Sequence, residues 1–143
     1  MNKMEAVQQL RSAKRAHLSW VMKANALIQG IPLDKEQVPV KSTECKFGQW
    51  YHSVANDLIF VPGFHEIEQP HDKLHSIYQD IFTLLIPEEK KGVIARLLGS
   101  QPEVSEKNKE KAKLLFQSLK EQSDRVIEYL DKMEQEIPES KSF

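Results

Sequence analysis

Residues 4–29 read MEAVQQLRSAKRAHLSWVMKANALIQ, and this stretch decides the fold class. Its apolar side chains recur every three or four positions, which is the spacing of one face of an α-helix. The residues on that face are Val7, Leu10, Ala13, His17, Val21, Ala24 and Ile28. Gly30 and Pro32 follow directly and are typical of a helix end. The sequence therefore predicts a long helix that carries His17 on its buried face.

The segment after this helix predicts an irregular insert and a second long helix. Residues 31–43 are interpreted as a loop, 45–54 as a short helix or turn, and 56–64 as a tucked connection interrupted by Pro62 and Gly63. A helix is then expected from about residue 70 to 86. Its inward stripe is His71, Leu74, His75, Tyr78, Ile81, Phe82 and Leu85.

The last part of the chain predicts two more helical pieces. A shorter one spans about 88–98 and ends at Gly99, and Ser100-Gln-Pro-Glu103 has the spacing of a capping box for the final helix. That helix continues to about Glu136, with an inward stripe of Leu115, Leu119, Val126, Leu130 and Met133. We expect an all-α fold, a four-helix bundle with an irregular insert between the first and second long helices. Residues 1–137 form the domain, and 138–143 a polar C-terminal tail.

Composition agrees with a single helical domain and excludes several classes of function. The 143 residues are 40% apolar and 29% charged, with five glycines, too few for an all-β chain rich in turns. A net charge of -1 argues against nucleic-acid binding. No apolar run reaches the roughly 18 residues that a membrane helix needs, and no signal peptide begins the chain, so we expect a cytoplasmic protein without a membrane partner. Basic residues gather in 1–23 and acidic ones in 128–139, which predicts complementary antiparallel ends.

One cysteine and three histidines form a complete set of metal ligands. His71 and His75 are four residues apart, so both project from one face of the predicted helix. His17 lies on the buried stripe of another helix, and Cys45 begins a tight aromatic segment in which Gly48 permits close backbone approach or a positive φ. Three imidazoles and one thiolate are sufficient for a tetrahedral zinc site. We therefore predict bound zinc.

Each ligand also has a simpler interpretation. His17 alone could be a core histidine with a hydrogen-bond partner, and Cys45 could be an ordinary buried residue. His71 and His75 could simply cap the start of a helix. Their combination with the aromatic flanks favours the metal. His52 and His65 lie outside this set and are expected at the surface, with His65 as the substitute if one assignment fails.

The ligand set argues against catalysis. Four protein ligands fill the preferred shell of zinc and leave no position for an activated water. The stretch His71-Asp-Lys-Leu-His75 has Asp72 where a zinc protease needs glutamate. A hemerythrin-like iron site needs bridging carboxylates, and a thiol suits it poorly. We expect no enzymatic activity.

Three motifs, His17-Leu-Ser-Trp20, Cys45-Lys-Phe-Gly-Gln-Trp50 and His71-Asp-Lys-Leu-His75, resemble the chemoreceptor zinc-binding (CZB) domain family. The resemblance implies a four-helix, zinc-holding sensor domain with ligands His17, Cys45, His71 and His75. Members are often dimeric and occur on bacterial chemoreceptors and diguanylate cyclases, where they respond to zinc or, through the cysteine, to reactive chlorine species.

Two hypotheses follow from the motifs and the resemblance. The first is a free-standing cytoplasmic zinc sensor, a homodimer that responds to zinc availability or oxidation of Cys45. Because the chain has neither a receptor signalling hairpin nor a cyclase domain, its output would pass through self-association or through a chemoreceptor or diguanylate cyclase in trans, unless the chain is a fragment. The alternative is a purely structural zinc module that acts as a scaffold or interaction protein.

Overall fold

The structure is a computed structural model that describes residues 2–31, 41–85 and 105–137. Within these residues every regular element is an α-helix, as the sequence predicts. In chain order the helices are α1 (Lys3–Ile28), α2 (Lys46–Ser53), α3 (Ala55–Leu58), α4 (Glu68–Leu85) and α6 (Glu106–Glu136). No helix of the described residues is long and apolar enough to cross a membrane.

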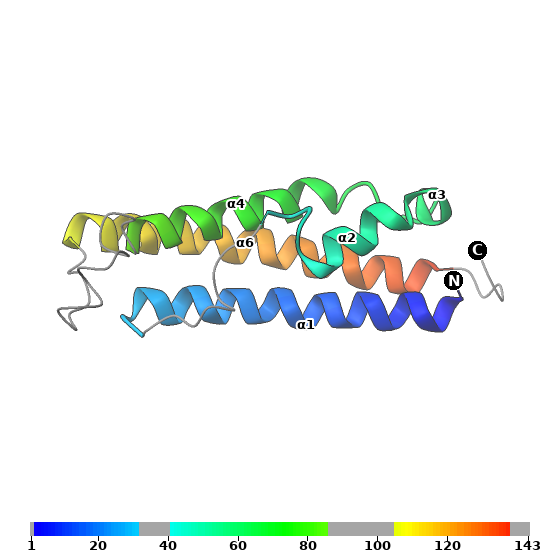
Figure 1. The fold of residues 1–143 in the computed structure, drawn as a ribbon, viewed down its shortest axis with the longest axis horizontal. Coiled ribbons are helices and arrows are strands. Elements are labelled where there is room, and N and C mark those ends of the chain that lie inside the picture. The colour runs from blue at the N-terminus through cyan, green and yellow to red at the C-terminus, as the bar shows by residue number, and fades with distance from the viewer. Residues whose placement is uncertain (1, 32–40, 86–104, 138–143) are drawn as a thin grey trace.

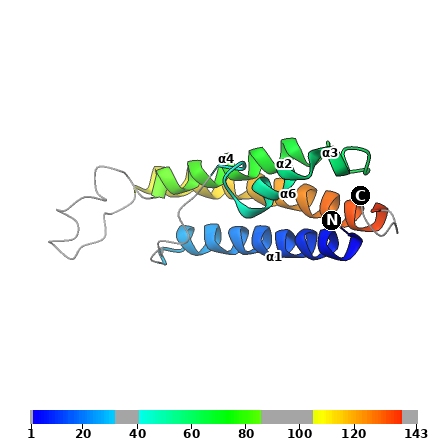
Figure 2. The same ribbon diagram turned by 45° about the vertical axis from the view of Figure 1, so that its right-hand side comes forward.

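Three long helices lie side by side and form an elongated molecule (Figures 1 and 2). α1 and α4 run in the same direction, and α6 runs antiparallel to both (Figure 1). α6 packs against each of the other two, whereas α1 and α4 contact each other less. The short helix α2 packs on α1, and α3 lies at the end of the molecule where α1 begins (Figure 1).

α1 begins and ends at residues whose local hydrogen bonds explain its bounds. Asn2 and Glu5 form a capping box, in which each side chain accepts from the other residue's backbone N–H. At the other end Gly30 has φ 84°, and the N–H of Ile31 donates to the carbonyl of Ala26 at 3.0 Å. This is the helix end that glycine favours. The predicted end at Gly30 is confirmed, and Pro32 lies outside the described residues.

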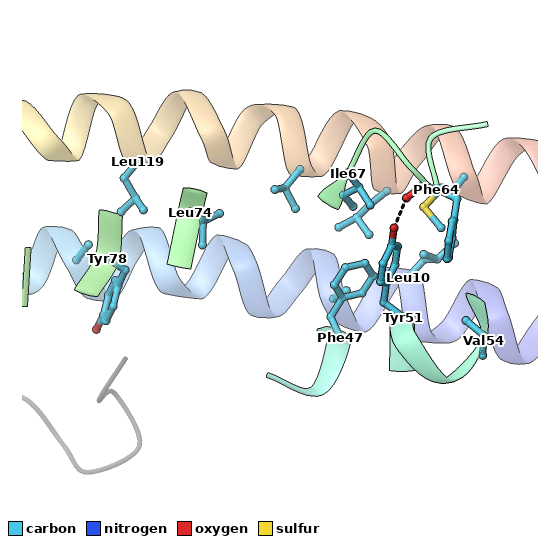
Figure 3. Close-up of a cluster of buried hydrophobic side chains, with 14 of the residues drawn as sticks. Leu10, Phe47, Tyr51, Val54, Phe64, Ile67, Leu74, Tyr78 and Leu119 are labelled. Carbon is cyan, nitrogen blue, oxygen red and sulfur yellow. Dashed lines mark hydrogen bonds between the residues drawn. The ribbon is translucent and has the colours of Figure 1, made fainter. Parts of the chain in front are cut away.

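The insert before α4 is more regular than the sequence suggests. Residues 56–58, the start of the predicted connection at 56–64, lie in the one-turn helix α3. The rest is irregular and passes through Gly63, which has φ 96°. The Tyr51 hydroxyl donates to the Phe64 carbonyl at 2.7 Å and fastens the connection to α2 (Figure 3). The sequence analysis did not predict α3, because four residues are too few to show a helical period.

A continuous apolar core joins the insert to the long helices (Figure 3). α1 contributes Leu10, α4 contributes Leu74 and α6 contributes Leu119, each at most 1% exposed. The insert adds Phe47, Tyr51, Val54, Phe64 and Ile67. The insert is therefore part of the core and fixes the short helix α2 against α1.

α4 matches its prediction, and α6 lies within the segment predicted for the final helix. α6 begins at Glu106, and its N-cap is Ser105, whose hydroxyl accepts from the N–H of Asn108 at 3.1 Å. The predicted segment 88–98 and the capping box at 100–103 lie outside the described residues, as does the tail 138–143. Of the predicted inward residues of α6, Leu115 is only partly buried.

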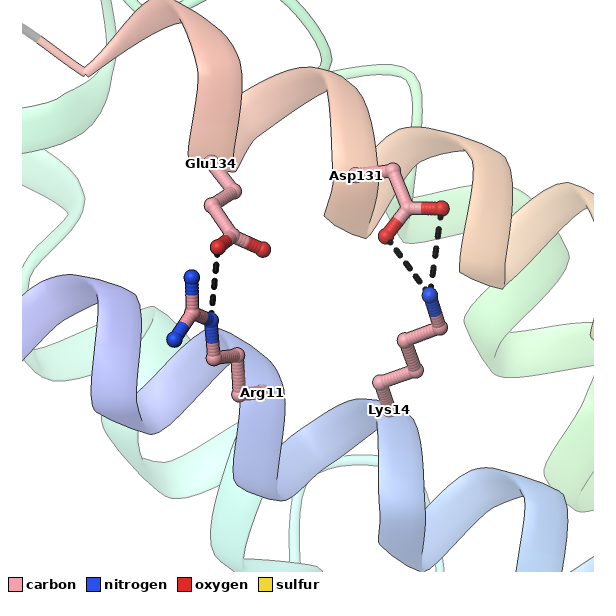
Figure 4. Close-up of polar contacts among 4 residues, drawn as sticks. All are labelled: Arg11, Lys14, Asp131 and Glu134. Carbon is pink, nitrogen blue, oxygen red and sulfur yellow. Dashed lines mark hydrogen bonds and ion pairs between the residues drawn. The ribbon is translucent and has the colours of Figure 1, made fainter.

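Two ion pairs join the N-terminal half of α1 to the C-terminal half of α6 (Figure 4). Arg11 contacts Glu134 at 2.7 Å, and Lys14 contacts Asp131 at 3.0 Å. The complementary ends expected from the charge pattern therefore meet. Because these side chains are partly exposed, each pair contributes only about 0.2–1 kcal/mol, and packing remains the main source of stability.

Candidate metal centre

The structure brings together the four side chains that the sequence analysis singled out. His17 comes from α1, Cys45 immediately precedes α2, and His71 and His75 come from α4. One ligand atom of each lies within 4.8 Å of those of the other three. The three histidines are at most 5% exposed, and Cys45 is partly buried. Three separate elements thus converge on one buried point.

The hydrogen bonding of His17 leaves one nitrogen available to a ligand. Its Nδ1 lies 2.6 Å from the carbonyl oxygen of Ala13, one turn earlier in α1. Since a carbonyl only accepts, Nδ1 carries the proton and Nε2 keeps its lone pair. Nε2 is buried and has no hydrogen-bond partner in the part of the chain that the structure describes. A buried polar atom without a partner is costly unless something binds it.

The sulfur of Cys45 is positioned by the backbone around it. Cys45 is the N-cap of α2, and its Sγ accepts from the N–H of Gly48 at 3.2 Å. The thiol also contacts the carbonyl of Ser42 at 3.3 Å and Nε2 of His71 at 3.4 Å. The sulfur therefore lies at the start of a helix, between its own turn and α4.

Gly48 is required by the close approach of the turn that precedes Cys45. A Cβ at this position would lie 1.8 Å from the carbonyl oxygen of Ser42. Of the two properties that the sequence analysis offered for Gly48, close backbone approach is confirmed. A positive φ is not found there, since the glycines with positive φ in the described residues are Gly30 and Gly63.

Aromatic side chains enclose the three imidazoles. The ring centroids of His17, His71 and His75 lie 4.7–5.8 Å from one another. Phe47 contacts His17 and His71 edge-on, with centroids 5.8 and 5.0 Å away. The ring centroid of Trp20 lies 6.0 Å from that of His75. These contacts restrict the rings and keep water away from them.

Burial controls the protonation of the cluster. Desolvation is the main cause that lowers the pKa of His17 to about 4 and that of His71 to about 2, with further lowering by the neighbouring histidines. Both rings are therefore neutral at pH 7 and offer lone pairs. Burial raises the pKa of the Cys45 thiol, although the hydrogen bond from Gly48 opposes this effect. Binding a cation through the sulfur consequently releases a proton.

The donor set and its spacing are compatible with zinc. Zinc bond lengths of about 2.0–2.3 Å place neighbouring ligand atoms of a tetrahedron about 3.3–3.6 Å apart. The sulfur of Cys45 and Nε2 of His71 already have this separation, at 3.4 Å. The remaining ligand atoms, all within 4.8 Å, need to move inward by only about an ångström.

The other histidines lie away from this cluster. His52 and His65 are exposed, as expected. Sequence reasoning missed two residues beside the site, Ser42 and Asp72, which are hydrogen-bonded to each other. Their only signal in the sequence is position, since Ser42 lies three residues before Cys45, and Asp72 lies between the two α4 histidines.

Of three comparisons with known proteins, one matched a segment that includes the four side chains of the cluster. Searches of curated proteins and of solved structures found no match. Residues 17–82, which include all four side chains, match the family model of the chemoreceptor zinc-binding domain. This match is consistent with a member of the chemoreceptor zinc-binding (CZB) domain family.

Proposed function

We propose that this chain is a zinc-binding sensor or regulatory domain in which His17, Cys45, His71 and His75 hold one zinc ion. The observation that carries the proposal is the convergence of these four ligand atoms within 4.8 Å at a buried point. The ion would connect α1, α4 and the turn before α2. Structural zinc sites contribute on the order of 10 kcal/mol at neutral pH, comparable with the stability of a whole domain.

Metal analysis of protein purified without added metal tests the site. We expect about one zinc ion per chain. Cys45→Ala should lower zinc affinity by more than about 100-fold, because it removes a ligand and the only thiolate. His52→Ala is the matched control, since His52 is exposed and outside the cluster, and it should bind like the unaltered chain. A substoichiometric ion that dialyses away easily would contradict the site.

The sensing role is proposed to depend on Cys45, the one ligand that an oxidant destroys. Its thiolate gives two electrons to hypochlorous acid, which yields sulfenic acid and chloride, and sulfenic acid is a poorer zinc ligand. We expect hypochlorite to release zinc before helical circular dichroism is lost. Equal zinc retention in treated and untreated protein would remove the oxidant from the proposal and leave zinc availability as the stimulus.

The output is proposed to pass through self-association or a signalling partner in trans, such as a chemoreceptor or diguanylate cyclase in the cytoplasm. Solution scattering and oligomeric state, compared for zinc-bound, chelated and oxidised protein, separate this role from that of a scaffold. A sensor changes shape or association before it unfolds. A scaffold keeps both until unfolding. We propose a homodimer for the zinc-bound state, and no enzymatic activity.

The complete fold is proposed to be a four-helix bundle with the irregular insert between α1 and α4. α1, α4 and α6 supply three long helices, and the apolar pattern of residues 88–98 supports a further helical piece between α4 and α6.

A further inference from the structure

We propose that Asp72 is a positioning residue that holds the turn formed by residues 41–45 against α4, and thereby slows both the release of metal and the chemical modification of Cys45. This inference rests on the proposed metal site for its first effect. Its second effect concerns the thiol itself and applies to the zinc-free chain as well.

The contact between the turn and α4 is a hydrogen bond from the Ser42 hydroxyl to the Asp72 carboxylate. Asp72 follows His71 and lies within the turn of α4 that carries both histidines. A hydrogen bond to a carboxylate is stronger than one between neutral groups. The turn is therefore attached directly to the element that supplies two of the four ligands.

Hydrogen bonds connect the residues of the turn to one another and to the sulfur of Cys45. The N–H of Glu44 donates to the carbonyl of Lys41 at 2.9 Å, and Gln49 in α2 donates to the carbonyl of Glu44 at 3.1 Å. The same Ser42 whose hydroxyl contacts Asp72 accepts the Cys45 thiol at its carbonyl, 3.3 Å away. Holding Ser42 therefore also holds the sulfur.

Across the described residues, two polar contacts connect this turn to α4. One joins Cys45 to His71, and the other joins Ser42 to Asp72. The first is the contact that changes when the thiol binds metal, takes up a proton or is oxidised. The second does not involve the sulfur, so it remains when the first is lost. It keeps a released thiol close to the histidines and favours its return.

The hydrogen bond also lies beside a small cavity that borders His71. A cavity of about 10 Å³, enough for one water molecule, lies between α2 and α4. Ser42, Asp72 and His71 line it, together with Tyr51 and Glu68. We expect that breaking the hydrogen bond, which joins two residues of the cavity lining, opens the cavity to small reagents and chelators on the side of His71.

The test compares Asp72→Ala and Ser42→Ala with the unaltered chain in two rate measurements. One measures the transfer of zinc to an excess of chelator, and the other the modification of Cys45 by a thiol reagent in zinc-free protein. We expect both rates to rise about 10- to 100-fold, the usual effect of losing a residue that orients a ligand. The double variant should be no faster than either single variant, because all three lack the same hydrogen bond.

Two further variants separate position from charge. Asp72→Asn keeps an acceptor oxygen in place and should stay within about tenfold of the unaltered rates. Asp80→Ala removes an exposed carboxylate elsewhere on α4 and should change neither rate. Cobalt-substituted Asp72→Ala should retain its thiolate charge-transfer absorption at saturation, which shows that the ligand set is intact.

Two results would overturn the proposal. Rates in Asp72→Ala equal to those in Asp80→Ala would show that the hydrogen bond does not control the turn. If Asp72→Asn were as fast as Asp72→Ala, the carboxylate would act through its negative charge and not by holding the turn in position. If the unaltered chain holds no zinc, the proposed function fails, and the rate of thiol modification still decides the role of Asp72.

Discussion

Backbone contacts at Gly48 decide where the Cys45 sulfur lies. The carbonyl of Ser42 occupies the space that a side chain at position 48 would need, and the N–H of Gly48 donates to the sulfur. Gly48 therefore leaves room for the turn and also positions the Cys45 sulfur. Phe47, which is 6% exposed, adds the apolar anchor.

Gly48→Ala should accordingly damage the site. The new Cβ would lie 1.8 Å from the Ser42 oxygen, which is backbone and has to move. We expect a loss of about 1–3 kcal/mol in the free energy of unfolding and at least about a tenfold loss in zinc affinity. Urea unfolding and competition with a zinc chelator measure the two effects.

Gly30→Ala is the control for this prediction. Gly30 has φ 84°, and a Cβ added there would meet no atom within 4 Å, so alanine is strained there without a clash. It should lower stability by about 1 kcal/mol and leave zinc affinity unchanged. Equal zinc affinity in Gly48→Ala and Gly30→Ala would show that the turn can move without cost to the site.

At the residue level the cluster could be predicted, but its surroundings could not. The four side chains stand out because of their chemistry and their place on apolar stripes. Ser42 and Asp72 are ordinary polar residues, and their meeting depends on the three-dimensional path of the turn. The Ala13 carbonyl, which fixes the protonated nitrogen of His17, has no side-chain signal.

At the level of elements, prediction succeeded where a periodic pattern was long. The bounds of α1 and α4 differ from those expected by no more than about two residues, the usual uncertainty of helix ends. α2 lies in the segment that was predicted as a short helix or turn. α3 is a single turn and was missed. The capping box predicted at 100–103 lies outside the described residues, and the described N-cap of α6 is Ser105. Several serines and acids precede this helix, so local sequence offers more than one cap.

At the level of the whole molecule, the buried histidines should make the zinc-free protein sensitive to acid. Because folding lowers their pKa values, the unfolded chain binds more protons than the folded chain once the pH falls below about 6.5. This difference extends down to about pH 4 for His17 and about pH 2 for His71. Stability is thus full above pH 6.5 and declines below it. Each histidine contributes a slope of about 1.4 kcal/mol per pH unit over its range.

Urea unfolding of zinc-free protein at several pH values between 7.5 and 5 measures this slope. His17→Gln should reduce it, whereas His52→Ala should leave it unchanged. Acid should also remove bound zinc, because protons compete for the imidazoles and the thiolate. An unfolding free energy that stays constant over this range, or zinc that is retained well below pH 5, would contradict the site.

The placement of α6 has a mechanical consequence. The four side chains of the cluster come from α1, α4 and the turn before α2, while α6 packs on both α1 and α4. Packed interiors are nearly incompressible, so a change in the spacing of α1 and α4 cannot be absorbed locally. We therefore expect such a change to displace α6, which spans 31 residues, together with the two helices that carry the histidines.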